Sequence, residues 1–516
     1  MNVPVRGGAL VTDGELSPLF RAWLGGRAGR PAARDEWRRF LHAPSPAAGP
    51  APAWTVAAWR DRWLPELLAD QPDDPSRRLC AAQVARLAAG EADVVITGQQ
   101  PGFLGGPLYT LYKAAAAVAA AAARTAIGRP TVPLFWYGDD DDDRVEAFAP
   151  WLWDPARGAL LRATPPDGPA DQMVGASSAP AWSVAEAAWL ASREAGGGMA
   201  AELAAVWSLG RGQGLGWGRL QRRALLRLFA GTGLLAVSGD DAELHATAAP
   251  FYAALWPRRE ALARVARSAG EALVADGFHA QLGEGSLVRP LHLAEAGRRL
   301  TLSAAMADSP APPAAALLRP GVLLRSPVQD WLFRPCGVVV GPGELAYLVQ
   351  MQGVYDELGL TRAPLLPRLF ARAAPAGSTG VPAPDDATEP ATTDWPSLAA
   401  SLVEGAAAAL VTALQGAGLE PDRAARLAAR ETARWRDGAA RLLAREAVTA
   451  RGPTAGLPPW ERPLGRRQER TLALHGATAL WGEPFVALAR DAARQHFAEG
   501  ERDRWSEFVL PVPSPE

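Results

Sequence analysis

Residues 94–137 constrain the fold of this chain more than any other segment. A short apolar run, Val94–Ile96, leads into a turn with four glycines in nine residues, Gly98–Gly106. A helical pattern over 107–125 then starts with proline, and a second apolar run, Val132–Tyr137, follows it. Proline suits the first helical position because its missing N–H would have no partner there. Strand, helix and strand in this order predict an α/β fold with a parallel sheet covered by helices.

The same alternation recurs further along the chain. Helical patterns at 217–230, 241–256 and 343–358 alternate with apolar runs that predict strands. These runs are Gly233–Val237, Val322–Arg325, Gly337–Val340 and Leu365–Leu366. Together they predict an α/β core over residues 1–373, with a helical N-terminal segment and insertions at about 159–215 and 271–320.

The last part of the chain has a different composition. Residues 374–396 are rich in Pro, Ala, Thr and Asp, which predicts a linker. Residues 397–516 then contain two long helical patterns, and apolar residues recur every four positions from Leu398 to Leu414. This stripe predicts a helical hairpin with a C-terminal tail, which pairs within the chain or forms a dimeric coiled coil.

Composition narrows the class of protein. The formal net charge is −2, so no excess of basic residues indicates a nucleic-acid-binding protein. The hydrophobic fraction of 48% is that of an ordinary soluble protein. No apolar run reaches the roughly 20 residues that a membrane span needs. The two cysteines, Cys80 and Cys336, lie far apart and outside any CxxC pair, which favours a cytoplasmic protein without disulfides. A chain of 516 residues predicts two or three domains.

Lys113 is the only lysine among 53 basic residues. A composition that replaces lysine by arginine should spare lysine where a compact ammonium is required, because arginine is a broad planar fork. Alternatively, Lys113 has no special role and is a lysine that remained by chance on a helix surface. Lys113 falls about two turns into the helix after the glycine-rich turn, and Tyr109 shares its face.

The glycine-rich turn is the first candidate ligand site. Its position between a strand and a helix predicts backbone N–H groups and a helix N-terminus that face an anion. It matches neither GxGxxG nor the P-loop pattern, and tight packing of helix on strand is the alternative. The candidate binding residues are Thr97, Gly98, Gln99, Gln100, Gly102, Gly105, Gly106, Tyr109 and Lys113.

The acidic run Asp139–Asp143 is the second candidate, since it follows the strand after that turn. Neighbouring carboxylates raise one another's pKa or pair with a divalent cation, so Asp140, Asp141, Asp142 and Asp143 are candidate catalytic residues. A solvated acidic loop is the alternative.

A third group lies further along the chain. Arg325 could hold a carboxylate, with Gln329 and Asp330 beside it, and a second Gly-Pro-Gly turn supplies Gly341, Gly343 and Glu344. Glu344 could instead only stabilise the helix dipole. His279 is the one histidine in a polar, motif-like context and is a candidate for catalysis, although lone histidines are commonly structural.

Four segments together resemble the bacillithiol-biosynthesis cysteine ligase family (BshC). They are the stretch TGQQPGFLGGPLYTLYK at Thr97–Lys113, Val132–Asp143, Gly277–Gln281 and Arg325–Pro367. The resemblance implies a Rossmann-like core of nucleotidyltransferase type with inserted segments and a C-terminal coiled coil that dimerises. It further implies a ligase that adds L-cysteine to the amino group of glucosaminyl malate.

For this chemistry we expect ATP or a related nucleotide, together with a divalent metal. One departure stands out: the family's Glu-Asp-His-Asp corresponds here to Asp140–Asp143, so Asp142 replaces a histidine. That change leaves two alternatives open. They are a related ligase or nucleotidyltransferase for another amino sugar or amine, and a dimeric binding protein with reduced catalysis.

Overall fold

The computed structural model describes residues 3–26, 32–44, 58–148, 150–162, 168–177, 198–212, 216–375, 395–418, 420–425, 427–428, 432, 460–463, 466–500 and 505–515. Two compact units emerge, one made of 1–380 with 469–516 and the other of 381–468. The sequence had placed 469–516 with the C-terminal hairpin, whereas these residues pack on the α/β core.

A five-stranded parallel sheet forms the centre of the first unit, in the order β11-β10-β2-β3-β6. Its strands are β2 (Asp93–Gln99), β3 (Thr131–Tyr137), β6 (Leu235–Ser238), β10 (Gly337–Val340) and β11 (Leu365–Pro367). The Rossmann-like α/β prediction is confirmed at this level. Every residue of β3 is buried, as expected for a strand covered on both faces.

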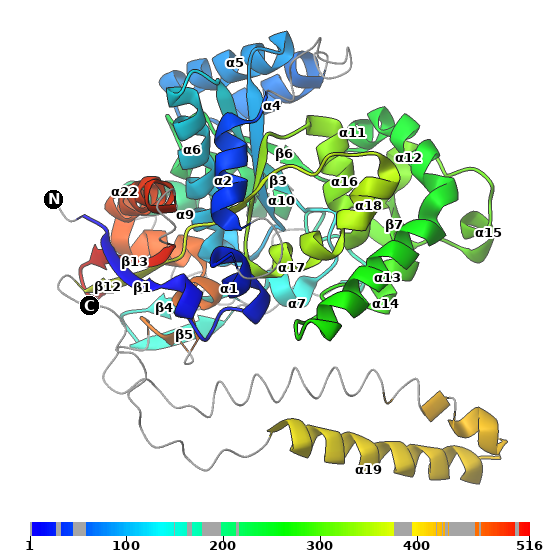
Figure 1. The fold of residues 1–516 in the computed structure, drawn as a ribbon. Coiled ribbons are helices and arrows are strands. Elements are labelled where there is room, and N and C mark those ends of the chain that lie inside the picture. The colour runs from blue at the N-terminus through cyan, green and yellow to red at the C-terminus, as the bar shows by residue number, and fades with distance from the viewer. Residues whose placement is uncertain are drawn as a thin grey trace. The chain divides into compact units, whose positions relative to one another are not determined.

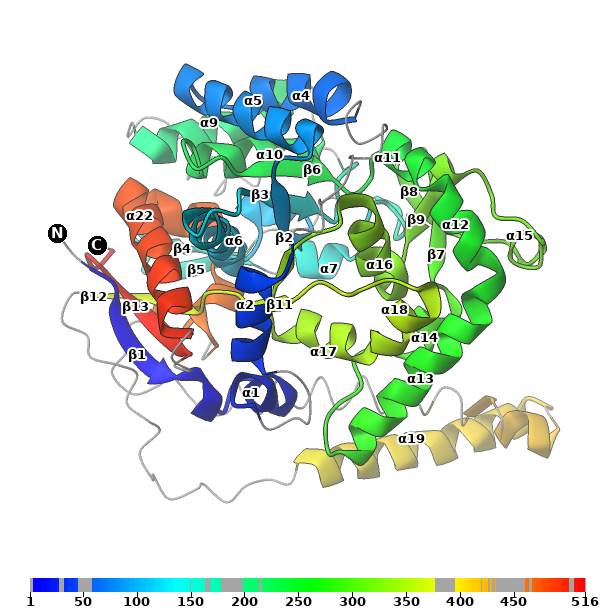
Figure 2. The same ribbon diagram turned by 45° about the horizontal axis from the view of Figure 1, so that its top comes forward.

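Helices connect and cover the strands (Figures 1 and 2). The connecting helices are α6 (Tyr109–Ala126), α10 (Trp217–Leu228), α11 (Ala242–Thr247), α12 (Ala249–Leu255), α13 (Arg259–Ala275), α16 (Val322–Phe333), α17 (Pro342–Gln350) and α18 (Gln352–Leu358). The alanines of α6 are largely buried, which lets this helix approach β2 and β3 closely. Figure 2 shows α22 (Leu474–Gly500) beside α6, with α12 and α13 on the opposite side of β2.

Two predicted helices are each divided. The pattern at 241–256 forms α11 and α12, because Pro250 starts a new helix, and the pattern at 343–358 breaks at Met351 into α17 and α18. The predicted strand Val322–Arg325 is wrong, because these residues form the first turn of α16 after Gly321. A short apolar run fits either element, and here Leu323 and Leu324 are buried while Val322 and Arg325 are partly exposed.

Smaller sheets lie outside the parallel one. The region predicted as an insertion at 271–320 holds α14 (Glu284–Val288), α15 (Ala304–Ala307) and an antiparallel sheet in the order β8-β7-β9. Its strands are β7 (Leu291–Glu295), β8 (Arg298–Thr301) and β9 (Leu318–Pro320). The insertion at 159–215 includes β5 (Ala159–Arg162), which pairs with β4 (Trp151–Asp154), and α9 (Gly198–Gly212).

The N-terminal segment is mainly helical, as predicted, although it begins with a strand. Its elements are β1 (Val5–Ala9), α1 (Pro18–Leu24), α2 (Ala33–His42), a π-helix at Ala58–Trp63, α4 (Leu64–Asp70) and α5 (Asp74–Ala89). Strand β1 pairs with β13 (Ser506–Val512), which also pairs with β12 (Ala371–Pro375).

In the second unit, α19 (Trp395–Gly416) is helical as predicted, while 433–459 lie outside the described residues. The second long helix, α22, packs on α6 instead of serving as the other arm of a hairpin. The predicted coiled coil is therefore not confirmed. Cys80 and Cys336 are buried free thiols, and none of the helices in the described ranges combines the length and apolar character that crossing a bilayer requires.

Candidate functional site

The carboxyl ends of β2 and β10 meet where the strand order reverses. Along the chain, β3 and then β6 are added on one side of β2, and the later strands β10 and β11 are added on its other side. In open α/β sheets, ligands bind in the crevice at this reversal. Gln99 ends β2, Gln100 follows it and Glu344 follows β10, and all three residues are partly exposed. Gln99 Nε2 donates to Gln100 Oε1 at 3.0 Å and to the Tyr109 hydroxyl at 3.3 Å.

Lys113 closes the base of this crevice. Its Nζ atom donates to the Gly98 carbonyl oxygen at 2.8 Å and to Gln99 Oε1 at 2.9 Å, and pairs with Glu344 Oε2 at 2.8 Å. The residue is 3% exposed, and burial lowers the pKa of its ammonium although Glu344 opposes this. Three acceptors match the three N–H bonds of the ammonium. Lys113 therefore joins β2 to the helix after β10.

The glycine-rich turn is packed inside the protein. Gln221 of α10 accepts from the Gly102 N–H at 2.6 Å and donates to the Gly105 carbonyl at 3.1 Å. The N–H groups of Gly105 and Gly106 bond to carbonyl groups within the turn. A Cβ atom on Gly102 would lie 2.9 Å from the carbonyl oxygen of Ala147. The donors that the sequence assigned to an anion are thus occupied by the protein, and these glycines permit close packing.

Two arginines neutralise the acidic loop after β3. The Oδ2 atoms of Asp140 and Asp141 each lie 3.2 Å from Arg325. Arg299 Nη1 lies 3.5 Å from Asp141 Oδ1 and 3.8 Å from Asp142 Oδ1. Asp140 is 1% exposed, whereas 41% of the Asp142 side chain is exposed. The run is therefore an arginine-bound loop and not a fully solvated one.

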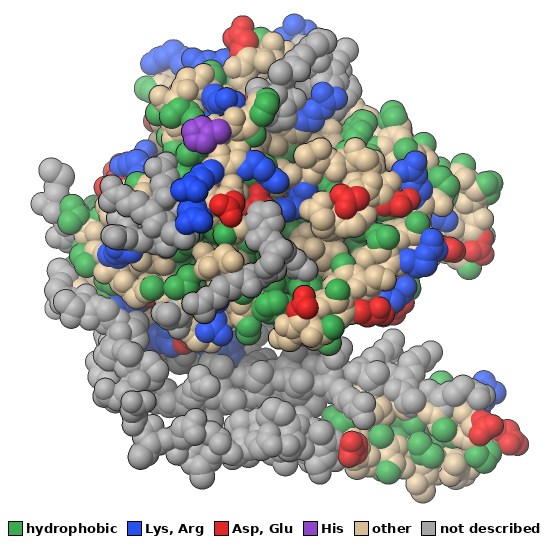
Figure 3. Space-filling view, viewed as in Figure 1, with side chains coloured by type: hydrophobic (Ala, Val, Ile, Leu, Met, Phe, Trp, Pro, Cys, Tyr) green, Lys and Arg blue, Asp and Glu red, His purple; other side chains and the backbone are tan. Residues whose placement is uncertain are grey.

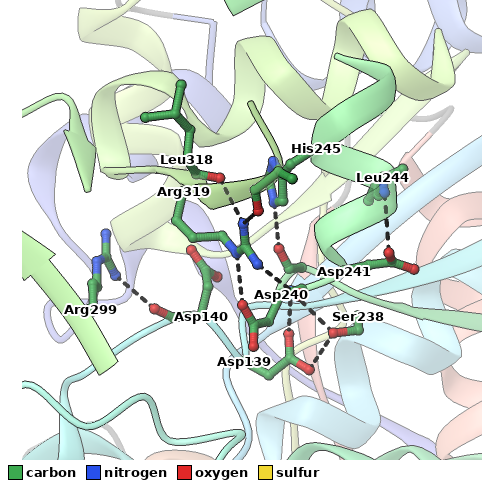
Figure 4. Close-up of polar contacts among 12 residues, drawn as sticks. Asp139, Asp140, Ser238, Asp240, Asp241, Leu244, His245, Arg299, Leu318 and Arg319 are labelled. Carbon is green, nitrogen blue, oxygen red and sulfur yellow. Dashed lines mark hydrogen bonds and ion pairs between the residues drawn. The ribbon is translucent and has the colours of Figure 1, made fainter. Parts of the chain in front are cut away.

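Beneath the loop lies a polar cluster that connects β3, β6 and β9 (Figure 4). Asp139 accepts from the Ser238 hydroxyl at 2.6 Å and from the backbone N–H of Asp240 at 3.0 Å. Arg319 donates to Asp240 Oδ1 at 2.7 Å. Burial, together with the Asp240 carboxylate, raises the pKa of Asp139 to about 7. This cluster fixes the loop from below.

A cavity of about 350 Å³ opens beside the acidic loop. Its lining comes from the loop after β3, α14 and the residues after it, strands β7 and β8, and the first residues of α16. The charged or ionisable lining residues are Asp141, Asp142, Arg289, His292, Arg299 and Arg325. Three guanidinium groups outnumber two carboxylates, and the helix N-terminus at Gly321 and Val322 adds partial positive charge. The balance favours an anionic ligand.

Arg325 lies between the cavity and the crevice. It lines the cavity, and it also interacts electrostatically with Tyr347 of α17, which in turn interacts with Glu344. The two spaces are therefore neighbours, separated by the charged side chain of Arg325 and the neutral side chain of Tyr347, both of which can donate hydrogen bonds.

The structure brings together many of the residues that the sequence singled out. Asp141, Asp142 and Arg325 line the cavity, with Asp140 directly behind them. Gln99, Gln100, Tyr109, Lys113 and Glu344 meet at the crevice, with Gly341 and Gly343 in the turn above Glu344. Glu344 also accepts from the Gly341 N–H at 2.8 Å and so caps the first turn of α17.

Other predicted site residues lie elsewhere. Thr97 donates to the Val339 carbonyl at 3.1 Å and so joins two strands, and Asp143 caps a short helix, α7 (Arg144–Ala147). Gln329 and Asp330 are buried residues of α16 outside the cavity lining, and Tyr355 donates to Asp330 at 2.9 Å. His279 is an exposed residue outside the cavity lining.

Sequence reasoning missed Arg289, His292 and Arg299. His292 stands in the run Leu291-His292-Leu293, which looks like an ordinary strand with a structural histidine. One available signal was the density of basic residues at 289–299 inside a predicted insertion. Burial, together with Arg299, lowers the pKa of His292 to about 4, so its ring is neutral at pH 7.

The carboxylates here do not fit a resident divalent ion. Within the described ranges, no group of three or more His, Cys, Asp or Glu side chains is arranged to hold a metal. Asp140 and Asp141 instead bind arginine.

Comparison with known proteins gives the same family as the motifs. Residues 60–309 and 298–369 match the family described as "Bacillithiol biosynthesis BshC, N-terminal Rossmann-like domain".

Three relatives carry the provisional name cysteine ligase BshC. The protein of Koribacter versatilis is 30% identical over 316 residues, or 56% of each chain. That of Shouchella clausii is 27% identical over 331 residues, or 58% of each chain. That of Salinibacter ruber is 29% identical over 360 residues, or 61% of each chain. The chain thus matches somewhat more than half the length of these curated relatives.

Proposed function

The chain belongs to the BshC family of bacillithiol biosynthesis, and on that premise we propose that it is a ligase that joins L-cysteine to the amino group of glucosaminyl malate. The observation that carries the proposal is the arginine-lined cavity beside the switch-point crevice, with Arg325 between them. The cavity offers room for an anionic acceptor, and the activated amino acid would lie at the neighbouring sheet edge.

The reaction needs an activated carboxyl group, because a free carboxylate does not react with an amine. In the proposed sequence, a cysteine carboxylate oxygen attacks a phosphorus atom of ATP or a related nucleotide, a phosphoanhydride bond breaks, and pyrophosphate or the nucleoside diphosphate leaves, which gives a mixed anhydride. The acceptor amine attacks the carbonyl carbon, the phosphorus-bound oxygen leaves, and the amine loses a proton. A divalent ion would arrive with the nucleotide phosphates, since the protein residues alone do not fit one.

Residue roles follow from the charges. Gln99, Gln100 and Tyr109 would contact the nucleotide at the carboxyl end of β2. Arg289 and Arg325 would hold the malyl carboxylates in the cavity, and the exposed carboxylate of Asp142 would face the acceptor amine. Lys113 would act indirectly, by holding Gln99 and Glu344 in place.

The test is an assay of purified protein with cysteine, glucosaminyl malate, ATP and magnesium. We expect a new thiol product by mass spectrometry, and the nucleotide product distinguishes an adenylate from an acyl phosphate. Arg325→Ala should lower the rate by at least tenfold, while the exposed Arg77→Ala should not change it. Absence of product under varied divalent ions would refute the proposal.

A second candidate is ligation to a different amino sugar or amine. The departure at Asp142 favours it, because this carboxylate lines the cavity where the family has a histidine. A thermal-shift screen of amino sugars separates the two candidates: stabilisation by another amine, with none by glucosaminyl malate, selects the second.

We also propose a homodimer formed through the C-terminal helices, in the cytoplasm. Leu410 and Leu414 of α19 are only partly buried within the single chain, so the apolar stripe has area left to bury. Light scattering on the full chain should give twice the 54.4 kDa monomer mass. On the face shown in Figure 3, basic and acidic side chains are interspersed, which gives no reason to add nucleic acid as a partner.

A further inference from the structure

His292 is partly buried, and its hydrogen bonding differs from that of the buried histidines His245, His475 and His496. Both ring nitrogens of His245 are bonded, at 2.7 Å, to the Tyr252 hydroxyl and the Gly239 carbonyl. His475 accepts from Trp207, and His496 contacts the Pro367 carbonyl. No such bond joins the ring of His292 to another residue in the described parts of the chain, and the ring lines the cavity.

Charged groups face His292 from every element around it. The cations are four arginines: Arg289 before β7, Arg299 on β8, Arg319 on β9 and Arg325 on α16. The anions come from the loop after β3, and they are Asp140, Asp141 and Asp142.

Most of these charges are already paired with each other. Arg319 is bound to Asp240, and Arg299 and Arg325 are shared among the loop carboxylates. Arg289 is exposed and forms no ion pair with the residues that the structure describes. Arg289 is therefore a cation of the cavity lining that no carboxylate of the described residues binds, and the neutral ionisable side chain of this lining is a histidine with unused nitrogens.

We propose that an anionic group, carboxylate or phosphate, enters this cavity together with one proton, and that His292 takes up the proton. The proton comes from solvent, and no covalent bond of the ligand changes. Positive surroundings and partial burial disfavour the imidazolium ion in the empty cavity. A bound anion offsets the arginine charges, and the protonated ring can then donate a hydrogen bond to it.

This inference concerns binding and goes beyond the ligase activity. A ring whose pKa is about 4 in the free protein returns towards its ordinary value once an anion lies beside it. Affinity for the anion should then fall as pH rises through that range. If ligation fails in the assay while proton uptake persists, the inference stands and the proposed function does not.

Calorimetric titration tests it, with malate and inorganic phosphate as separate probes. Each is measured near pH 6 in two buffers of different ionisation enthalpy, and the dependence of the heat on the buffer gives the protons taken up. We expect more than about half a proton per bound anion in the wild type. The preferred probe identifies whether carboxylate or phosphate is the natural group.

The test variant is His292→Gln. The matched control is His42→Gln, which changes an exposed histidine on α2. His292→Gln should bind the anion without proton uptake, and His42→Gln should match the wild type. NMR of the His292 ring in the wild type gives a second readout, in which the anion should move its signal towards that of imidazolium. Binding without uptake, unchanged uptake in His292→Gln, or no binding of either anion would overturn the inference.

Discussion

Lys113 Nζ and Glu344 Oε2 lie 2.8 Å apart, and this pair bridges the point where the strand order of the sheet reverses. The ammonium also bonds to the Gly98 carbonyl and to Gln99. Three acceptors around one buried nitrogen suit a compact ammonium, whereas a planar guanidinium would not fit the same arrangement. This accounts for the retention of a single lysine in a chain with 53 basic residues.

Replacement of Lys113 by methionine should destabilise the protein. The change leaves the Gly98 carbonyl and the Glu344 carboxylate without their partner, and we expect a loss of about 2–4 kcal/mol in the free energy of unfolding. Urea denaturation measures it. Lys113→Met/Glu344→Gln should recover part of the loss, because the unpaired charge is removed. Additive effects of the two changes would show that the pair is not coupled.

The Arg368–Glu469 ion pair should be among the most costly to break. Arg368 follows β11 and is bound at 3.0 and 2.6 Å by Glu469, with both side chains at most 2% exposed. Arg368→Met should cost about 3–5 kcal/mol because it removes the guanidinium group that binds a buried carboxylate through two hydrogen bonds. Breaking the exposed Arg77–Asp74 pair in the same way should cost less than about 1 kcal/mol. Equal losses would contradict this interpretation.

Local pattern was sufficient to predict the parallel sheet. The run of β2 is short and is followed by a glycine-rich turn and a helical pattern, and the run of β3 follows that helix, so both strands were recognisable from local sequence. The run at Val322–Arg325 carries the same local signal but forms a helix, because periodicity over four residues does not distinguish a buried strand from the start of a helix. The sheet formed by β1, β12 and β13 joins residues about 500 positions apart, which no local pattern reveals.

The residues of the candidate site were predictable in part from local sequence, whereas their contacts depend on tertiary structure. Arg325 and Asp141 were recognised as polar residues near strand ends, although their 3.2 Å contact depends on the position of α16. The glycine-rich turn was recognised correctly as a turn, but its Gly102 N–H is bound by Gln221 from a distant helix, and the N–H groups of Gly105 and Gly106 bond within the turn. His292 was missed because its importance comes only from the arginines that surround it in space.

Gln221 should be required for the shape of the glycine-rich turn. Its side chain satisfies the Gly102 N–H and the Gly105 carbonyl, and it is 2% exposed. Gln221→Leu has similar volume but removes both hydrogen bonds, so we expect a loss of about 2–4 kcal/mol by urea denaturation. Gln352→Leu, which affects an exposed bond to Asp356, is the control and should change stability little. A neutral Gln221→Leu would mean that the turn does not need this support.

Asp139 should make stability fall as pH rises towards neutrality. Burial, with the Asp240 carboxylate, raises its pKa from 3.8 to about 7 in the folded protein. Between these values the folded state keeps a proton that the unfolded state has released, so this group's contribution is present at low pH and lost as pH approaches 7.

Asp139→Asn mimics the protonated form and keeps an acceptor for the Asp240 N–H. We therefore expect the variant to gain roughly 2–4 kcal/mol relative to wild type between pH 5 and 8. Urea denaturation across that range measures the difference, with the exposed Asp308→Asn as control. Parallel pH profiles for wild type and Asp139→Asn would show that Asp139 is already ionised when folded.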